Sequence, residues 1–244
     1  MLNECFVPVI SDQFHDLEVP GECGMIFQVG TFSSIGVSGS SYVEMCGSSI
    51  ACKFLSLRNV NKHRSYGNQM DNGYFECEVT YSKHITALGS HQCDNDDITR
   101  LRRISQLVQD AIQPSLYLDK YPKQLLSLSI VVLKSSSFDL CACINAASLA
   151  LADALVEMRD LPCAFAIHHL NRDKYPEKMS YYENIEELKV TLCILPNLGL
   201  SSLVQTEGRS SNEIVDACID SLVSKCDQIR NLMSTNLLKR SMNF

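Results

Sequence analysis

A basic loop is the first feature of this chain whose residue types and spacing could do chemistry. Arg58, Lys62 and Arg64 lie in a stretch that has no acidic residue between Lys53 and Arg64. Lysine and arginine neutralise phosphate charge, so the cluster is suited to salt-sensitive contacts with an RNA backbone. A solvated hairpin loop explains the same composition equally well, because charge clusters alone are weak indicators of RNA binding.

A second basic cluster lies in a segment of helical periodicity. Arg100, Arg102 and Arg103 are close in sequence, and Arg102 and Arg103 project away from the apolar stripe of that segment. Contact with phosphate and a plain solvated face are both consistent with this placement. The sequence therefore predicts candidate RNA-binding residues at Arg100 and Arg103, alongside the three of the basic loop.

Cysteine and histidine residues could suggest a metal site or a thiol nucleophile. Cys141 and Cys143 have a Cys-x-Cys spacing that is atypical of structural zinc, and the adjacent His168 and His169 point to opposite faces if they lie in a strand. Cys143 and Cys163 lie in apolar runs, where a thiolate is disfavoured. We therefore expect neither a metal site nor a cysteine-dependent catalytic site.

Composition excludes several classes of protein. The chain has 244 residues, 12 cysteines without a Cys-x-x-Cys pair, and a formal net charge of −7. We interpret the cysteines as reduced, buried thiols of a cytosolic or nuclear protein. The acidic balance disfavours a protein that binds RNA by itself. The first residues do not resemble a signal peptide, and no segment is apolar for the roughly 18 residues of a membrane span.

Alternating apolar and polar residues predict strands. Ile50, Cys52 and Phe54 alternate with small or polar residues, and Phe75 and Cys77 do so with acidic ones. Polar loops are expected at residues 58–72 and 91–97. Further strands are expected at residues 24–30, 42–45, 126–132, 163–168, 188–195 and 200–205.

Three helices are expected between and after these strands. Apolar residues recur at three and four from Leu101 to Ile112, with Asp96 or Asp97 as the N-cap. A capping box of the form Ser210-x-x-Glu213 predicts the start of a terminal helix.

The central helix, at about residues 139–158, is apolar on almost every side and should lie enclosed between other elements. Asp139 is its expected N-cap. Asp153 is expected to make a buried hydrogen bond rather than do chemistry. Strands followed by helices in this order indicate an α+β domain.

Two blocks of sequence resemble the second half of the RNase PH fold. Residues 141–160 read CACINAASLALADALVEMRD, and Tyr121-Pro122-Lys123 precedes a buried strand ahead of them. That family places an Asp-Gly-Gly loop before such a helix, whereas this chain has Ser135-Ser136-Ser137-Phe138-Asp139. The segment SGSSYVE at residues 38–44 resembles the start of the family's fold, so the resemblance extends from about residue 36 to the last helix.

The resemblance implies one RNase PH-like domain at residues 24–244, preceded by an arm at residues 1–23. Its architecture would be a pseudo-duplicated βαβα arrangement with mixed sheets and packed helices. The chain resembles most the RNase PH-like subunits of the eukaryotic RNA exosome core. The implied partners are other such subunits in a hetero-hexameric ring, S1/KH-type cap proteins, RNA and a separate catalytic nuclease. The implied location is the nucleus and nucleolus, and also the cytoplasm, without a membrane.

The same resemblance bears on catalysis. Arg100 falls near the arginine that holds phosphate in phosphorolytic members. The segment that carries their metal-binding carboxylates aligns with residues 179–184, where Ser180 and Asn184 replace both aspartates. Neutral oxygens bind divalent ions weakly, and replacing two glycines by Ser136 and Ser137 disfavours a phosphate-cradling backbone. We therefore expect no catalytic residues, no metal, no cofactor and no phosphorolysis.

The expected function is that of a non-catalytic exosome ring subunit that supports 3′→5′ RNA processing and degradation by scaffolding and RNA threading. The alternative is an active phosphate-dependent 3′→5′ exoribonuclease that uses other carboxylates, namely Asp173, Glu177, Glu183 or Glu186. A subunit that binds RNA by itself is a third reading, which the net charge disfavours.

Overall fold

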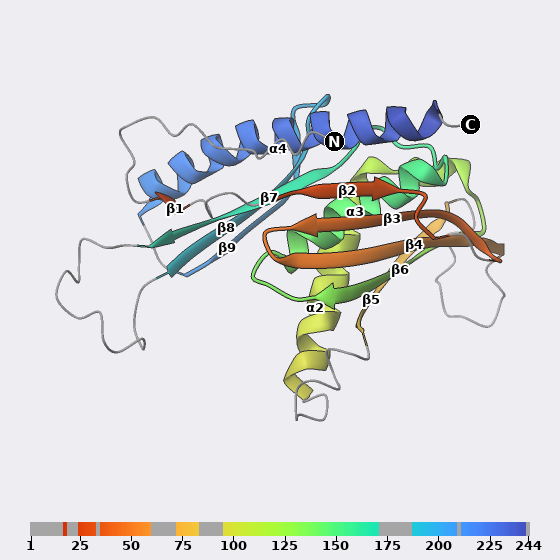
Figure 1. Ribbon diagram of the computed structural model, residues 1–244, viewed down its shortest axis with the longest axis horizontal. Coiled ribbons are helices and arrows are strands. Elements are labelled where there is room, and N and C mark those ends of the chain that lie inside the picture. Colours follow the sequence, from red (N-terminus) through yellow and green to blue (C-terminus); the bar gives the residue numbers. More distant parts are fainter. Residues whose placement is uncertain are drawn as a thin grey trace.

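The computed structural model describes residues 17–18, 24–32, 35–59, 72–82, 95–170, 187–208 and 211–242. The described elements form two sheets with helices packed between and beside them (Figure 1). None of the helices in these ranges is long and apolar enough to cross a bilayer.

The larger sheet has five strands in the order β2-β3-β4-β6-β5. Its members are β2 (Ile26–Val29), β3 (Val37–Met45), β4 (Ser48–Asn59), β5 (Tyr74–Tyr81) and β6 (Gln124–Lys134). The pair β5 and β6 is parallel, and the other pairs are antiparallel. The sheet is therefore mixed, as expected.

The smaller sheet has four antiparallel strands in the order β1-β7-β8-β9. They are β1 (Leu17–Glu18), β7 (Cys163–Leu170), β8 (Glu187–Leu195) and β9 (Leu200–Glu207). Two residues of the expected N-terminal arm thus pair with β7, while the rest of residues 1–23 lies outside the described ranges.

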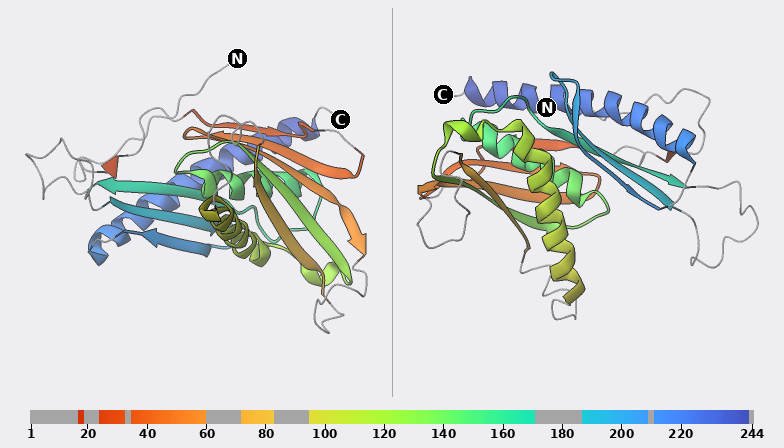
Figure 2. Two further views of the ribbon diagram at one scale, coloured as in Figure 1. Left: turned by 90° about the horizontal axis from the view of Figure 1, so that it is seen from below. Right: turned by 180° about the vertical axis from the view of Figure 1, so that it is seen from behind.

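The helices are α2 (Asn95–Ile112), α3 (Asp139–Asp153) and α4 (Asn212–Ser241). Two short 3₁₀ helices, Gln113–Ser115 and Leu118–Lys120, connect α2 to β6. α2 and α3 lie between the two sheets, and α4 packs along β7 and β8 (Figure 2).

The enclosure of α3 confirms the expectation from its all-round apolar sequence. Every residue from Asp139 to Leu151 is buried, and the helix contacts β3 and β4 of one sheet and β7 of the other. The side chain of Asn145 exchanges two 2.9 Å hydrogen bonds with the backbone of Ala164 in β7. Ser41 of β3 donates a 2.6 Å hydrogen bond to the carbonyl oxygen of Ala146. The helix is therefore bonded to both sheets.

Asp153, near the end of α3, makes partly buried hydrogen bonds, where its apolar context predicted a buried one. Its side chain is 10% exposed and lies 3.4 Å from Nε of Arg240 in α4. Its Oδ2 accepts a 2.9 Å hydrogen bond from the backbone N–H of Ser40. Asp153 therefore ties the end of α3 to β3 and α4.

The expected caps differ from those observed. α3 begins at Asp139, so Phe138 is at the N-cap and Asp139 is one residue further in. α4 begins at Asn212 with Ser211 as N-cap and no side-chain capping bond, which displaces the predicted capping box by one residue. Eight described cysteines are free and buried, but Cys46 in the β3–β4 turn is disulfide-bonded, contrary to the expectation of reduced thiols.

Candidate functional site

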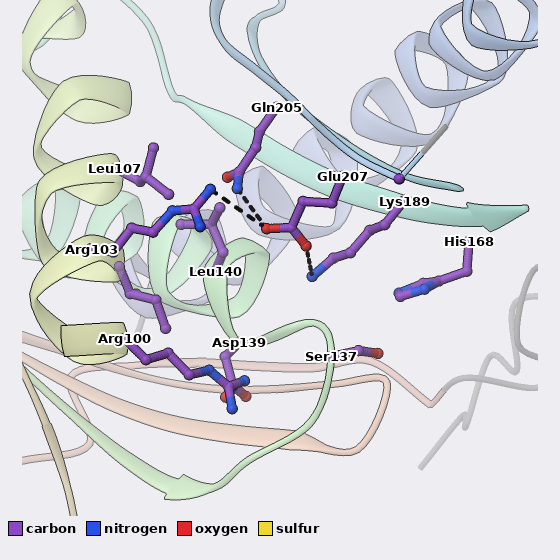
Figure 3. A pocket seen from close by; sticks show the side chains of 12 residues that line it. Arg100, Arg103, Leu107, Ser137, Asp139, Leu140, His168, Lys189, Gln205 and Glu207 are labelled. Carbon is purple, nitrogen blue, oxygen red and sulfur yellow. Dashed lines mark hydrogen bonds and ion pairs between the residues drawn. The ribbon is translucent and has the colours of Figure 1, made fainter. Parts of the chain in front are cut away.

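A pocket of about 430 Å³ opens where α2, the start of α3 and strands β7 to β9 meet. Its charged lining comes from distant parts of the chain (Figure 3). The polar and charged lining residues are Arg100, Arg103, Ser137, Asp139, His168, Lys189, Gln205 and Glu207. Three cations and two carboxylates therefore share one cavity.

Asp139 is the most enclosed charged group of this pocket. The residue is 2% exposed. Its Oδ1 accepts hydrogen bonds from Oγ of Ser48 at 2.7 Å and from the backbone N–H of Ser136 at 2.8 Å. Its Oδ2 accepts a short hydrogen bond from Oγ of Ser135. Both oxygens are thus bonded within the chain, which offsets the cost of burying the carboxylate.

Arg100 of α2 extends toward this carboxylate. Its Nη2 lies 3.6 Å from Oδ2 of Asp139, and its side chain is 51% exposed. In Figure 3 the Arg100 side chain runs from α2 to the Asp139 carboxylate, with which its guanidinium overlaps in this view. The arginine that sequence resemblance placed near the phosphate site is therefore paired with an acidic residue of the same chain.

The second carboxylate, Glu207 at the end of β9, links three side chains. Its Oε1 lies 3.8 Å from Arg103 and accepts a 2.8 Å hydrogen bond from Nε2 of Gln205. Its Oε2 lies 3.9 Å from Nζ of Lys189. Lys189 and Glu207 face each other because they are register partners in the β8–β9 hairpin. Arg103 therefore forms an ion pair with Glu207 of β9 while its side chain stays 66% exposed.

The thiols of the core are poor nucleophiles. Burial raises the pKa of Cys141 to about 12 and also raises the pKa values of Cys143 and Cys163. His168 packs against the ring of Phe138, with centroids 5.1 Å apart. In the part of the chain that the structure describes, no group of three or more His, Cys, Asp or Glu residues could hold a metal ion.

The structure brings together only part of the predicted basic set. Arg100 and Arg103 both line the pocket. Arg58 is near the end of β4, where its backbone is the register partner of Leu125 in β6. Lys62 and Arg64 lie outside the described residues, as does the whole segment 179–184.

Sequence reasoning missed several members of the site. Ser48, Lys189 and Glu207 were not singled out, because their partners are distant in sequence, as Asp139 is at 91 residues from Ser48. The sequence does contain one local indication of this site, because the serines three and four residues before Asp139 are close enough to bond its carboxylate. Ser135 and Ser136 do so, which closes the loop on itself.

Comparison with known proteins places this geometry in context. Residues 25–157 match the RNase PH family, described as "3′ exoribonuclease family, domain 1". The chain is 27% identical over 199 residues to the exosome complex component Rrp41 of Nitrosopumilus maritimus, covering 82% of this chain and 80% of that one. It is 34% identical over 175 residues to Rrp41 of Thermococcus gammatolerans, covering 72% and 68%. It is 24% identical over 224 residues to the RRP41-like component of Arabidopsis thaliana, covering 88% and 83%.

The fold has a solved counterpart. The crystal structure of rice Rrp46 superposes with a TM-score of 0.65 at 17% identity, covering 87% of this chain and 94% of that one. The match at residues 25–157 spans more than half of the 244 residues and includes β3, β4 and α3. This chain belongs to the RNase PH family.

Proposed function

We propose that this chain is a non-catalytic RNase PH-like subunit of an RNA exosome ring. It would support 3′→5′ RNA processing and degradation by holding the ring together and guiding RNA toward a separate nuclease. The relatives described above are named as exosome components, and the chain covers 80% of the Nitrosopumilus protein. Similarity over nearly the whole domain supports a shared architecture.

The non-catalytic proposal rests on one observation, which is that both carboxylates of the pocket already have bonding partners within the chain. A divalent ion beside phosphate needs accessible acidic oxygens. Both oxygens of Asp139 are bonded to serines or the backbone, and Glu207 faces Lys189 and Arg103. Within the described residues, the carboxylate beside Arg100 is therefore enclosed and bonded at both oxygens, and the more exposed Glu207 is paired with two cations. Ser180 and Asn184, at the positions of the family's metal-binding aspartates, support the same proposal from the sequence.

An assay of nucleotide release tests this proposal. The full chain, alone and reconstituted with sister subunits, is incubated with labelled RNA, inorganic phosphate and magnesium. We expect no release of nucleoside diphosphate, while a phosphorolytic member of the family releases it under the same conditions. Steady release that requires phosphate and this chain would overturn the proposal.

The alternative is an active phosphate-dependent 3′→5′ exoribonuclease, which the description of the family as exoribonucleases favours. Its acidic residues would be Asp173, Glu177, Glu183 or Glu186, which lie outside the described ranges. If release is observed, changing each of the four to its amide identifies the group responsible.

RNA contact is proposed at the basic residues named from the sequence. Arg103 is 66% exposed, and an exposed ion pair such as that with Glu207 is easily exchanged for a phosphate. Changing Arg58, Lys62 and Arg64 together to Ala should shrink the RNA footprint of a reconstituted ring. The slope of log affinity for RNA against log salt concentration should become shallower by about one unit per lost phosphate contact. An unchanged footprint would mean that these side chains are solvated and do not contact RNA.

The position within the ring is a finer part of the proposal. Gln113-Pro114-Ser115-Leu116 and the segment LCILP at residues 192–196 resemble the ring subunit called the mRNA transport regulator homolog. Mass spectrometry of proteins that purify with the tagged chain tests this assignment through its neighbours, including S1/KH-type cap proteins. Microscopy of the same tagged chain tests its proposed location in nucleus, nucleolus and cytoplasm.

A further inference from the structure

The amino-terminal end of α3 has a negatively charged side chain built into it. The first N–H groups of a helix lack partners within the helix and carry a partial positive charge, so such ends are ready binding sites for phosphate. Asp139 is the first residue of α3, and its carboxylate is almost fully enclosed there. A carboxylate in this position satisfies the same electrostatic demand as a bound anion.

The groups around α3 that could serve an external anion are turned toward Asp139. The hydroxyls of Ser48 and Ser135 and the backbone N–H of Ser136 all donate to its two oxygens. Arg100 supplies the positive charge from α2, at 3.6 Å. The hydroxyls of Ser48 and Ser136 also lie 2.6 Å apart, so the donors form one connected network.

A phosphate that entered the pocket would meet unfavourable conditions at this point. It would approach a fixed negative charge and compete for an arginine that is already paired. The pocket is nevertheless accessible, because the Arg100 side chain is half exposed and the cavity measures about 430 Å³. The cavity beside Arg100 would therefore have room for an anion, and the fixed negative charge of Asp139 would oppose its binding.

We propose that Asp139 is a built-in anion that prevents Arg100 and the start of α3 from binding an external phosphate, and that neutralising Asp139 creates a phosphate site there. The inference rests on the proposed function only through the resemblance that relates Arg100 and this loop to phosphate binding. The ligand class is a phosphate group, either inorganic or at the terminus of an RNA.

Isothermal titration calorimetry of the full chain with inorganic phosphate, at constant ionic strength, tests the proposal. Native protein should show no saturable binding in the millimolar range. The isosteric Asp139→Asn variant should bind at least about tenfold more tightly, because a unit charge a few ångströms away is removed. Equal behaviour of the two proteins would refute the proposal. Short RNAs with and without a terminal phosphate, titrated in the same way, distinguish the two ligand sources.

Two further variants locate the effect. Adding Arg100→Met to Asp139→Asn should abolish the new binding, since the guanidinium is lost while the rest of the loop is unchanged. Glu157→Gln removes one negative charge from an exposed ion pair with Lys120 outside this pocket, and it should leave phosphate binding as weak as in native protein. Tight phosphate binding by Glu157→Gln, or binding that survives the loss of Arg100, would contradict the role of Asp139.

A measurement on the native chain covers the case in which Asp139→Asn does not fold. Inorganic phosphate should not raise the Tm of native protein above that in chloride at equal ionic strength. A saturable rise in Tm that disappears in Arg100→Met would overturn the proposal. These assays measure binding without turnover, so their outcome is independent of nucleotide release and ring assembly, which test the proposed function.

Discussion

Gly39 of β3 lies so close to Ala150 of α3 that a methyl group on Gly39 would be 2.4 Å from the carbonyl oxygen of Ala150. The same methyl group would be 2.5 Å from the backbone nitrogen of Ala154. Both neighbours are backbone atoms of the last turn and the C-cap of α3, so neither can move aside easily. The glycine therefore sets the distance between the larger sheet and α3.

Gly39→Ala should destabilise the protein by about 1–3 kcal/mol, because overpacking forces shifts of the backbone. Urea unfolding followed by circular dichroism measures the change. Gly24→Ala is the matched control, since a Cβ at Gly24 would meet nothing within 4 Å. Equal stability of the two variants would mean that β3 and α3 separate at little cost.

Leu155 is a second position where the backbone constrains the residue type. It follows the last turn of α3 with a φ of 56° and is 87% exposed. The N–H of Val156 bonds to the carbonyl of Leu151, and that of Leu155 to the carbonyl of Ala152, both at 3.1 Å. This is the Schellman arrangement, in which glycine is the favoured residue at the left-handed position.

Leu155→Gly should therefore stabilise the protein by about 1 kcal/mol, since the left-handed conformation is costly for a residue with a Cβ. Thermal unfolding reports the gain. Leu155→Ala keeps the Cβ and should change stability by less than about 0.5 kcal/mol. A decrease in Tm for the glycine variant would show that the exposed leucine makes a contact worth more than the strain.

The buried thiols predict a loss of stability in alkali. Burial raises the pKa of Cys77 and Cys141 to about 12 and that of Cys193 to about 11, whereas unfolded thiols have a pKa of about 8.5. Between these values the folded chain retains protons that the unfolded chain loses. The contribution is thus fully present below about pH 8.5 and is lost as pH rises toward the folded values.

Each such thiol should lower the free energy of unfolding by up to about 1.4 kcal/mol per pH unit above about pH 9. Urea unfolding at pH 8, 9 and 10 under reducing conditions measures the slope. Cys193→Ala removes one titrating group and should make the slope shallower. The same free energy at pH 8 and pH 10 would indicate that these thiols ionise in the folded protein.

The edge strand β9 gives a prediction for assembly. Among the described strands it pairs only with β8, and it exposes Leu200 at 58% and Val204 at 49%. Exposed apolar edges favour pairing with another chain. If β9 contacts a sister subunit, Leu200→Lys with Val204→Lys should greatly reduce recovery of the other ring subunits.

The Tm of the isolated chain should remain nearly unchanged in this double variant, because both side chains are exposed. Leu155→Lys, which alters an exposed leucine beyond the end of α3, is the matched control and should retain full recovery. Undiminished recovery with the double variant would assign the contact to another surface.

Local sequence patterns predicted the elements better than their ends. The alternation in β5 gave the correct buried face, with Phe75 and Cys77 inside and Glu76 and Glu78 outside. The apolar stripe of α2 was also correct at Ile104 and Val108. Caps were predicted less well because they depend on single residues, and tertiary partners can take a side chain away from a capping role.

Asp139 illustrates why the site itself exceeded what sequence could predict. An acidic residue ahead of an apolar helix is a normal N-cap signal. In the fold, Ser48 at the start of β4, 91 residues away, bonds the carboxylate, and Arg100 approaches it from another helix. Likewise, Glu207 meets Lys189 through hairpin register and Arg103 through packing of α2 on β9. These distances arise only from the tertiary arrangement.

The enclosure of α3 has a consequence for how such chains are recognised. The residues of a helix that packs against two sheets are constrained by volume and shape. These packing constraints do not depend on whether the protein is catalytically active. The alanine-rich sequence of α3 therefore indicates family and fold, but it does not indicate catalytic activity. Active and inactive homologues should instead be distinguished by the few side chains at the N-terminus of the helix, where Asp139 bonds its neighbouring serines.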